Sequence, residues 1–169
     1  MPLSSSLALS AFAEQTSALD LGSAKAPFRL QRSVSLGSGT GAGQADLVWS
    51  DRRTIAASGT EDLDLAGSLV DAFGATVTFV RIKGLFIAAS ADNTNDVVIG
   101  GDASSAWATL LNAAGTITLR PGAACGFLAG DADDTGYAVT AGTGDLLQVA
   151  NSGGSTGVDY DILIVGASA

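Results

Sequence analysis

The sequence contains no histidine and a single cysteine, Cys125, in 169 residues. Without histidine, catalytic triads with an imidazole base and metal sites with imidazole ligands are excluded. One cysteine excludes an internal disulfide framework and a zinc site built from thiolates. Because Cys125 stands among apolar residues in Ala-Ala-Cys-Gly-Phe-Leu, we interpret it as a small buried hydrophobic side chain.

Long hydrophobic runs are also missing, since no apolar stretch reaches the ~18–20 residues of a membrane span. The short apolar stretch near the start is interrupted by Ser10 and follows no lysine or arginine, so a secretory signal is not predicted. Charged residues make up only 15% of the chain, and the net charge of −9 argues against nucleic acid as the main partner. Neither a membrane nor a nucleic acid is therefore expected as a partner.

The charge is unevenly distributed along the chain. Residues 1–53 carry five basic and four acidic residues, a net of +1. Residues 54–169 carry three basic and thirteen acidic residues, a net of −10. An acidic body and an arginine-bearing amino-terminal segment are expected to face different surroundings.

Glycine, by contrast, is abundant at 22 residues, and the hydrophobic fraction of 47% is too high for a disordered chain. The length is enough for one domain with a substantial core. Short segments of alternating apolar and polar residues recur at roughly ten-residue spacing, separated by turn residues. The pattern predicts an all-β fold: an antiparallel β-sandwich, jelly-roll-like, with about nine or ten strands and an extended amino-terminal arm.

The densest apolar segment is residues 75–89, which we predict to be one long central strand. Its apolar residues are mostly β-branched or aromatic, as in a half-buried sheet. The alternation slips by one residue at Phe79 and Val80, which predicts a β-bulge, and Gly84 then permits a bend.

The chain divides into residues 1–43, an arm with a glycine-rich linker, and residues 44–169, the sandwich body. Residues 37–43 contain four glycines and predict a flexible linker. They are not interpreted as a phosphate-binding loop, because no Lys-Ser/Thr ending follows.

Within the arm, residues 1–26 show no strand pattern, and the serines at 4–6 are expected to cap a short helix over residues 7–12. Residues 28–36 are extended, with one side formed by Phe28, Leu30, Arg32 and Val34. Because Arg32 interrupts that side, the segment is a poor core strand and is expected to lie on a neighbour.

Alternation in the body assigns buried faces to several strands. Leu63 and Leu65 are expected to point inward, and residues 107–111 are interpreted as a further short strand. The last strand, residues 158–165, has a single apolar face, formed by Val158, Tyr160, Ile162 and Ile164. Its polar residues Asp159 and Asp161 are expected to be exposed or to meet arginine or lysine across a strand pair.

Two polar loops carry enough oxygen ligands for a hard cation, one with three aspartates and one with two aspartates and two asparagines. They comprise Asp131, Asp133 and Asp134, and Asp92, Asn93, Asn95 and Asp96. The first loop has Gly142 where a calcium hand has its glutamate, so we interpret both as solvated loops with no metal.

Two other clusters have a chemical and a structural interpretation. Carboxylates at Glu61, Asp62 and Asp64 resemble a catalytic pair, but solvent-facing strand charge is favoured because no polar pocket can be inferred around them. Three aromatic residues are compatible with a carbohydrate platform, but we favour core or interface packing for them: Trp49, Trp107 and Tyr160.

Several stretches are similar to those of a known class of protein. They run through residues 41–54, including Asp46-Leu-Val-Trp-Ser-Asp-Arg-Arg53, and then 61–67, 71–79, 93–100, 119–122, 142–145, 150–153 and 160–164. Together they resemble small virion structural proteins of tailed bacteriophages, encoded among head and tail genes, over about residues 40–166. The resemblance implies a virion protein, with no catalytic motif.

The resemblance and the composition together predict a non-enzymatic, cofactor-free protein that decorates the capsid and stabilises the assembled shell. Its partners would be the major capsid protein or other virion proteins, in a virion assembled in the bacterial cytoplasm, with a homotrimer expected. Contact with the partner is assigned to the arm, through Phe12, Phe28, Arg29, Leu30 and Arg32. The alternatives are a tail, fibre or baseplate component that contacts the host surface, and a carbohydrate-binding module or glycan-active enzyme on the same fold.

Overall fold

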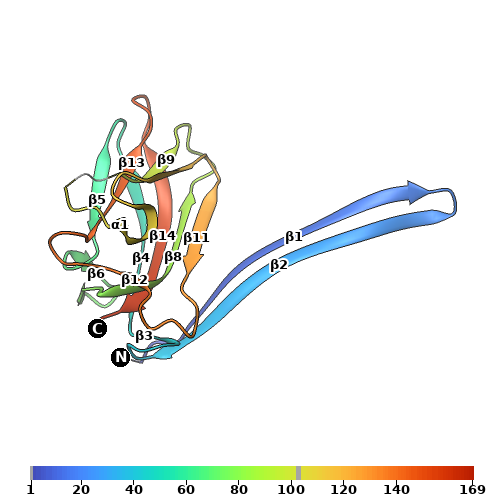
Figure 1. The fold of residues 1–169 in the computed structure, drawn as a ribbon. Coiled ribbons are helices and arrows are strands. Elements are labelled where there is room, and N and C mark those ends of the chain that lie inside the picture. Colours follow the sequence, from blue (N-terminus) through green and yellow to red (C-terminus); the bar gives the residue numbers. More distant parts are fainter. Residues whose placement is uncertain (1, 102–103) are drawn as a thin grey trace.

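The computed structural model describes residues 2–101 and 104–169. Strands account for 57% of the residues and helix for 2%, and the strands form several antiparallel sheets. The predicted all-β antiparallel sandwich is therefore confirmed, whereas the jelly-roll connectivity stays a prediction. Figure 1 shows a sandwich body and a long hairpin that leaves it at one end.

Two sheets form the body. The five-stranded sheet has the order β11 (Ala124–Leu128), β8 (Arg81–Ala89), β14 (Val158–Ala167), β4 (Leu47–Ile55), with β12 (Tyr137–Ala138) also paired to β8. The four-stranded sheet has the order β10 (Thr116–Leu119), β9 (Val97–Gly100), β13 (Leu146–Asn151), β5 (Thr60–Asp64). A small pair is formed by β6 (Leu69–Val70) and β7 (Thr76–Val77).

The core lies between these sheets and is filled by their inward residues. Leu63 and Leu65 are buried, as alternation predicted. So are the four predicted inward residues of β14: Val158, Tyr160, Ile162 and Ile164. Trp49, Trp107 and Tyr160 are only 4%, 4% and 1% exposed, which confirms the packing interpretation and leaves none of the three as an exposed platform.

The prediction of one central strand over residues 75–89 was wrong. The segment is two strands, β7 and β8, that belong to different sheets. The chain crosses between them at Phe79, which is 1% exposed, and Val80, which is 41% exposed. The phase slip in the sequence therefore marks a change of sheet. A register shift does occur in β8, but opposite Val165 and Gly166, which pair with Gly84 and Ile82.

Residues 107–111 also differ from the predicted strand. They form one helical turn, α1 (Ala108–Leu111), because the Trp107 side chain turns into the core and its indole N–H donates to the Ala138 carbonyl at 2.9 Å. Over residues 2–101 and 104–169, no helix has the length and hydropathy to cross a bilayer.

The amino-terminal segment is a hairpin of β1 (Ser5–Leu19) and β2 (Gly22–Ser38), and the predicted helix over residues 7–12 was wrong. The two strands pair in antiparallel register from Ser5 opposite Leu36 to Leu19 opposite Gly22. A six-residue helix is marginal alone, whereas pairing with β2 gives this segment a continuous ladder of backbone hydrogen bonds. Figure 1 shows the hairpin extending away from the sandwich, with its tip far from the body.

The glycine-rich residues predicted to be a flexible linker form a hydrogen-bonded turn instead. The Gly37 N–H donates to the Gly43 carbonyl at 3.0 Å, and the Gly39 N–H donates to the Ala45 carbonyl at 3.2 Å. The strand β3 (Gln44–Ala45) then pairs in parallel with the end of β2. Gly39 and Gly43 have φ angles of 142° and 64°, a region that favours glycine. The glycines of this segment therefore allow a tight turn.

Tyr160 gives the fold a dependence on alkaline pH. Burial raises the pKa of its phenol to about 12 against the opposing effect of the Arg53 guanidinium, and its hydroxyl donates to Glu61 Oε2 at 3.1 Å. Because the folded chain holds this proton more tightly than the unfolded chain, the stabilisation is complete below pH 10 and is lost toward pH 12.

We expect the free energy of unfolding to fall by roughly 1.4 kcal/mol per pH unit within that window because of Tyr160. Urea unfolding at a series of pH values measures the fall, and the variant Tyr160→Phe, which keeps the ring, isolates this phenol from other groups. Equal slopes for the two proteins would contradict the assignment.

Candidate functional site: the hairpin arm and the open sheet face

The hairpin, which we call the arm (residues 5–38), has two chemically different faces. Residues directly opposite each other in an antiparallel pair project to the same side, and sides alternate along each strand. One side, the apolar face, collects the following residues: Leu7, Leu9, Ala11 and Ala13 of β1 and Ala26, Phe28, Leu30, Arg32 and Val34 of β2. Only Arg32 interrupts this series with a charge.

The opposite side of the arm, the polar face, is rich in serine and charged residues. It includes Ser6, Ser10, Glu14, Thr16, Lys25, Gln31, Ser33 and Ser35. Lys25 Nζ and Glu14 Oε1 form an ion pair across the strands at 3.2 Å. Phe12 also lies on this face, with the Arg29 guanidinium 6.0 Å from the centre of its ring, close enough for a cation–π interaction.

The five residues assigned to the arm from sequence therefore divide between its faces. Phe28, Leu30 and Arg32 share the apolar face, as the alternation in residues 28–36 predicted, whereas Phe12 and Arg29 pair on the other. Phe28 is 60% exposed and Leu30 is 64% exposed. Their role in partner contact stays a prediction.

Sequence reasoning missed the half of the apolar face that β1 provides. The signal was present, because Leu7, Leu9, Ala11 and Ala13 recur at every second position. It was masked by Ala8 and Phe12, which occupy the polar face and make the segment equally compatible with a short helix.

The arm is anchored where its apolar face meets the outward face of the five-stranded sheet. Leu7 and Leu36 are buried there against Ala45 and Val165. Glycine on the sheet makes the approach possible, since a Cβ on Gly84 would lie 2.5 Å from Leu7 Cδ1. A Cβ on Gly126 would likewise lie 3.0 Å from Leu9 Cδ2.

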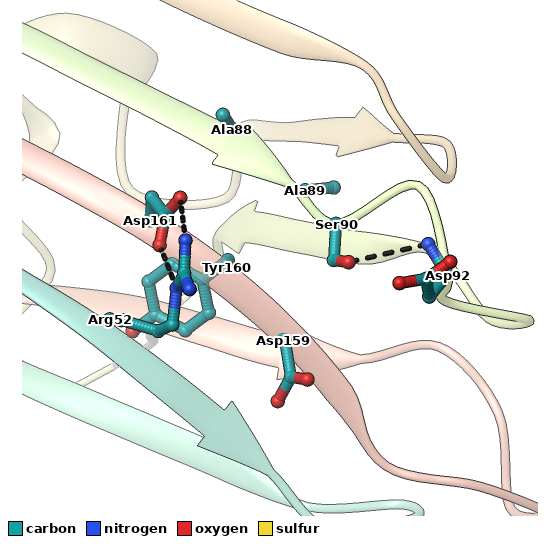
Figure 2. Close-up of a pocket in the computed structure, with 8 residues that line it drawn as sticks. All are labelled: Arg52, Ala88, Ala89, Ser90, Asp92, Asp159, Tyr160 and Asp161. Carbon is teal, nitrogen blue, oxygen red and sulfur yellow. Dashed lines mark hydrogen bonds and ion pairs between the residues drawn. The ribbon is translucent and has the colours of Figure 1, made fainter.

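Beyond this anchor the outward face of the same sheet is uncovered, and we call that area the open sheet face. It begins with an apolar groove at the centre of the sheet, lined among others by Phe86, Ala88, Ala124 and Leu163. A shallow depression of about 370 Å³ adjoins it, with polar walls that include Arg52, Ser90, Asp159 and Asp161 (Figure 2). The open sheet face therefore changes from apolar to acidic along its length.

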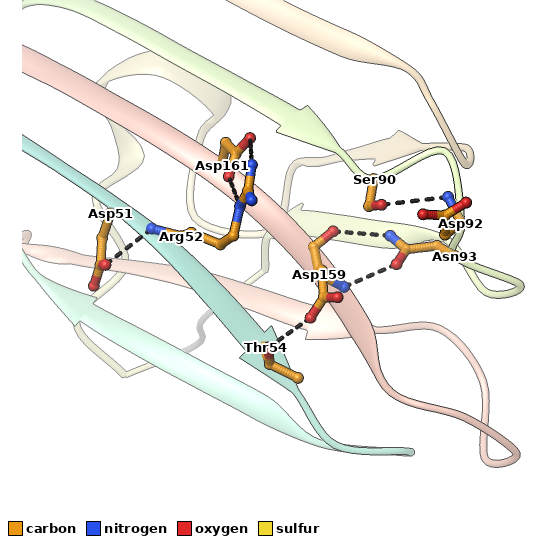
Figure 3. Close-up of polar contacts among 8 residues, drawn as sticks. All are labelled: Asp51, Arg52, Thr54, Ser90, Asp92, Asn93, Asp159 and Asp161. Atoms are coloured by element: carbon orange, nitrogen blue, oxygen red, sulfur yellow. Dashed lines mark hydrogen bonds and ion pairs between the residues drawn. The ribbon is translucent and has the colours of Figure 1, made fainter.

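The acidic end is held in place by bonds across neighbouring strands (Figure 3). Arg52 Nε and Nη2 donate to the two carboxylate oxygens of Asp161 at 2.6 and 2.9 Å. This hydrogen-bonded pairing lowers the pKa of Asp161 and raises the pKa of Arg52. A carboxylate kept ionised in this way accepts hydrogen bonds and attracts cations but is a poor proton donor.

Two side chains help to position Asp159. The Thr54 hydroxyl donates to its carboxylate at 2.5 Å, and the Asn93 side chain bonds both its main-chain groups, at 2.9 Å to the carbonyl and 2.8 Å to the N–H. The expectation that Asp159 and Asp161 are exposed or meet an arginine across a strand pair is confirmed. The loop residue Asn93 therefore joins the sheet through main-chain bonds.

The aspartate loop after β11 is organised by the protein's own cations. The Lys83 ammonium donates to the Asp133 carbonyl at 2.5 Å, and the Arg81 guanidinium donates to the Asp134 carbonyl. Burial lowers the pKa of Lys83, and backbone N–H groups of Gly136 and Thr135 lower the pKa of Asp133. Across the described parts of the chain, no three metal-ligating side chains of the His, Cys, Asp or Glu type gather at one point.

No protein-family model, no curated protein and no solved structure matched the chain. The features of the molecule that point to a function are therefore the arm and the open sheet face. Both surfaces are suited to contact with another protein, because each exposes an apolar area: the apolar face of the arm and the groove at the start of the open sheet face.

Proposed function

We propose that the protein is a structural component of a tailed-phage virion that decorates the capsid and stabilises the assembled shell, without enzymatic activity or a cofactor. The arm is the part that adheres to a neighbouring protein in the particle. The observation that carries this proposal is the arm's apolar face, which is buried only at its base and stays exposed at Phe28 and Leu30.

An exposed two-stranded ribbon is a poor structure for a protein that acts alone. Isolated hairpins are marginally stable in water, and an uncovered apolar face gains free energy when another surface covers it. Contact with a neighbour therefore stabilises the arm and the assembly together. Because such binding occurs only where the shell is assembled, it favours the assembled state by mass action.

The phage resemblance supports the location of the protein in the virion, and the acidic body supports its orientation. Residues 39–169 carry five basic and fifteen acidic residues, a net of −10, whereas residues 1–38 carry three basic and two acidic ones, a net of +1. A strongly acidic body suits solvent exposure on the particle, with the near-neutral arm toward the partner.

A glycan-binding function has no comparable support, because the three aromatic residues considered for it are buried in the core. A tail, fibre or baseplate location would use the same kind of arm, and copy number separates it from shell decoration.

We expect purified virions to contain the protein at about one copy per major capsid protein, as closed shell symmetry repeats each binding site. Quantitative gel or mass-spectrometric analysis of intact particles measures the ratio, and the major tail protein in the same particles serves as an internal control. A handful of copies per particle would place the protein in the tail instead and would overturn the decoration proposal.

A further inference from the structure

We propose that the distal arm of one copy of this chain seats its apolar face on the open sheet face of a second copy, so that decorating subunits hold one another. This inference rests on the proposed function in taking the arm as the adhesive element, and it names the partner of that element. It concerns the apolar face at Ala11, Phe28 and Leu30 and the groove lined by Phe86, Ala88, Ala124 and Leu163.

The first support is that the protein already makes this type of contact within one chain. At the base of the arm, Leu7 lies on Gly84 and Leu9 approaches Gly126, so the apolar face packs on the outward face of the five-stranded sheet. The distal rungs continue that apolar face by two further pairs, Ala11 with Leu30 and Ala13 with Phe28. The apolar surface that is buried at the base of the arm therefore continues toward the tip, where it is exposed.

The second support is that the receiving surface continues from the same anchor in the other direction. Strand register orders its outward residues in successive rungs. Gly84 pairs with Leu128 and Val165 at the anchor, Phe86 pairs with Gly126 and Leu163 on the next rung, and Ala88 pairs with Ala124 and Asp161 beyond that. Ala88 and Ala124 are small beside Phe86 and Leu163, and they leave an apolar groove into which leucine and phenylalanine can project.

The third support is charge complementarity. Arg32 is the one cation on the apolar face of the arm, next to Leu30 along the strand, and its Nη1 donates to the main-chain carbonyl of Gln31. The open sheet face ends in the exposed carboxylates of Asp92, Asp159 and Asp161. Asp161 is already paired with Arg52, so Asp92 and Asp159 give this end its net negative charge. Leucine in the groove and Arg32 toward Asp92 and Asp159 would place an apolar side chain on the apolar area and a cation on the acidic area.

A chain cannot satisfy its own groove with its own distal arm. Continuous pairing from Ser5–Leu36 to Leu19–Gly22 keeps the ribbon extended, and Figure 1 shows it directed away from the body. The contact joins two different surfaces, so its repetition gives a ring where the rotation between copies closes and an open chain where it does not. Each copy of the chain carries one arm and one groove, so a second copy supplies a partner for each.

The test compares self-association of the full-length protein with that of variants, using analytical ultracentrifugation. Leu30→Asp introduces a charge on the apolar face, and Gln31→Asp introduces the same charge one residue away on the polar face. Ala124→Asp changes the exposed edge of the groove, and Ala91→Asp changes an exposed loop residue near it. Because all four positions are at the surface, circular dichroism should show an unchanged fold.

We expect the unmodified protein to associate, and Leu30→Asp and Ala124→Asp each to weaken association by about 30-fold or more. Gln31→Asp and Ala91→Asp should associate like the unmodified protein. Mixing Leu30→Asp with Ala124→Asp should restore one contact per pair, because the first retains an intact groove and the second an intact arm. Monomeric unmodified protein, or variants that associate normally, would overturn the inference, and so would a mixture that stays monomeric.

The oligomeric state tests arm exchange, and the copy number in the particle tests decoration, so the two proposals can fail independently. A protein that is monomeric in solution but present at about one copy per major capsid protein would contradict arm exchange while supporting decoration. A self-associating protein present in only a handful of copies would support arm exchange while contradicting decoration.

Discussion

Replacing Phe79 with alanine is expected to lower the free energy of unfolding by about 3–5 kcal/mol, as for other buried aromatic rings. Phe79 is 1% exposed and lies where the chain crosses from β7 to β8. Its ring is packed against Gly166 so closely that a Cβ there would lie 2.7 Å from Phe79 Cδ1. Truncation therefore leaves a cavity that β14 cannot close without moving its backbone.

Denaturant unfolding followed by tryptophan fluorescence measures the effect of Phe79→Ala. The slope of the unfolding free energy against denaturant concentration is expected to stay unchanged. The matched control is Val80→Ala, one residue along, because Val80 is 41% exposed. We expect the control to change stability by less than about 1 kcal/mol. Equal effects of the two substitutions would show that the crossing is not part of the core.

The second large effect is expected in binding to the particle. The double variant Phe28→Asp, Leu30→Asp introduces two charges on the exposed apolar face of the arm, and we expect affinity for shells lacking the protein to fall by about 100-fold or more. In the proposed arrangement, each added carboxylate would be buried unpaired against an apolar partner at a large desolvation cost, and copies that no longer held one another would also lose avidity. Co-sedimentation with such shells measures the loss.

The control for that experiment is Gln31→Asp, Ser33→Asp, which introduces the same charge with the same spacing on the polar face. Both double variants change only exposed arm residues, so their unfolding transitions should coincide with that of the unmodified protein. Comparable binding by the two variants would mean that the apolar face is not the adhesive surface.

Much of the body could be predicted from sequence because each strand has one buried side. In β14, apolar residues at 158, 160, 162 and 164 fixed both the strand and its inward face. The same alternation could not separate β7 from β8, because a change of sheet looks locally like a bulge. Only the tertiary positions of Phe79 and Val80 show which of the two occurs.

The arm was harder to predict because its structure depends on pairing between its own halves. Residues 28–36 have a usable alternation, which predicts Phe28, Leu30 and Arg32 on one side, as the register of the hairpin shows. Residues 7–12 fit a helix as well as a strand until β2 is set against them. The open sheet face was not predicted at all, since an outward groove is formed by β8, β11 and β14 from distant parts of the chain.

The strict two-residue alternation of the arm also restricts how its length can vary in evolution or in design. Inserting a single residue in β1 beyond Ala13 would turn every later side chain of that strand to the opposite side and mismatch it with β2. Lengthening between the anchor at Leu7 and the rungs of Leu30 and Phe28 keeps these two residues on the apolar side only if two residues are added in each strand, opposite one another. The reach of the arm can therefore be tuned only in discrete steps of about 7 Å, the advance of two strand residues.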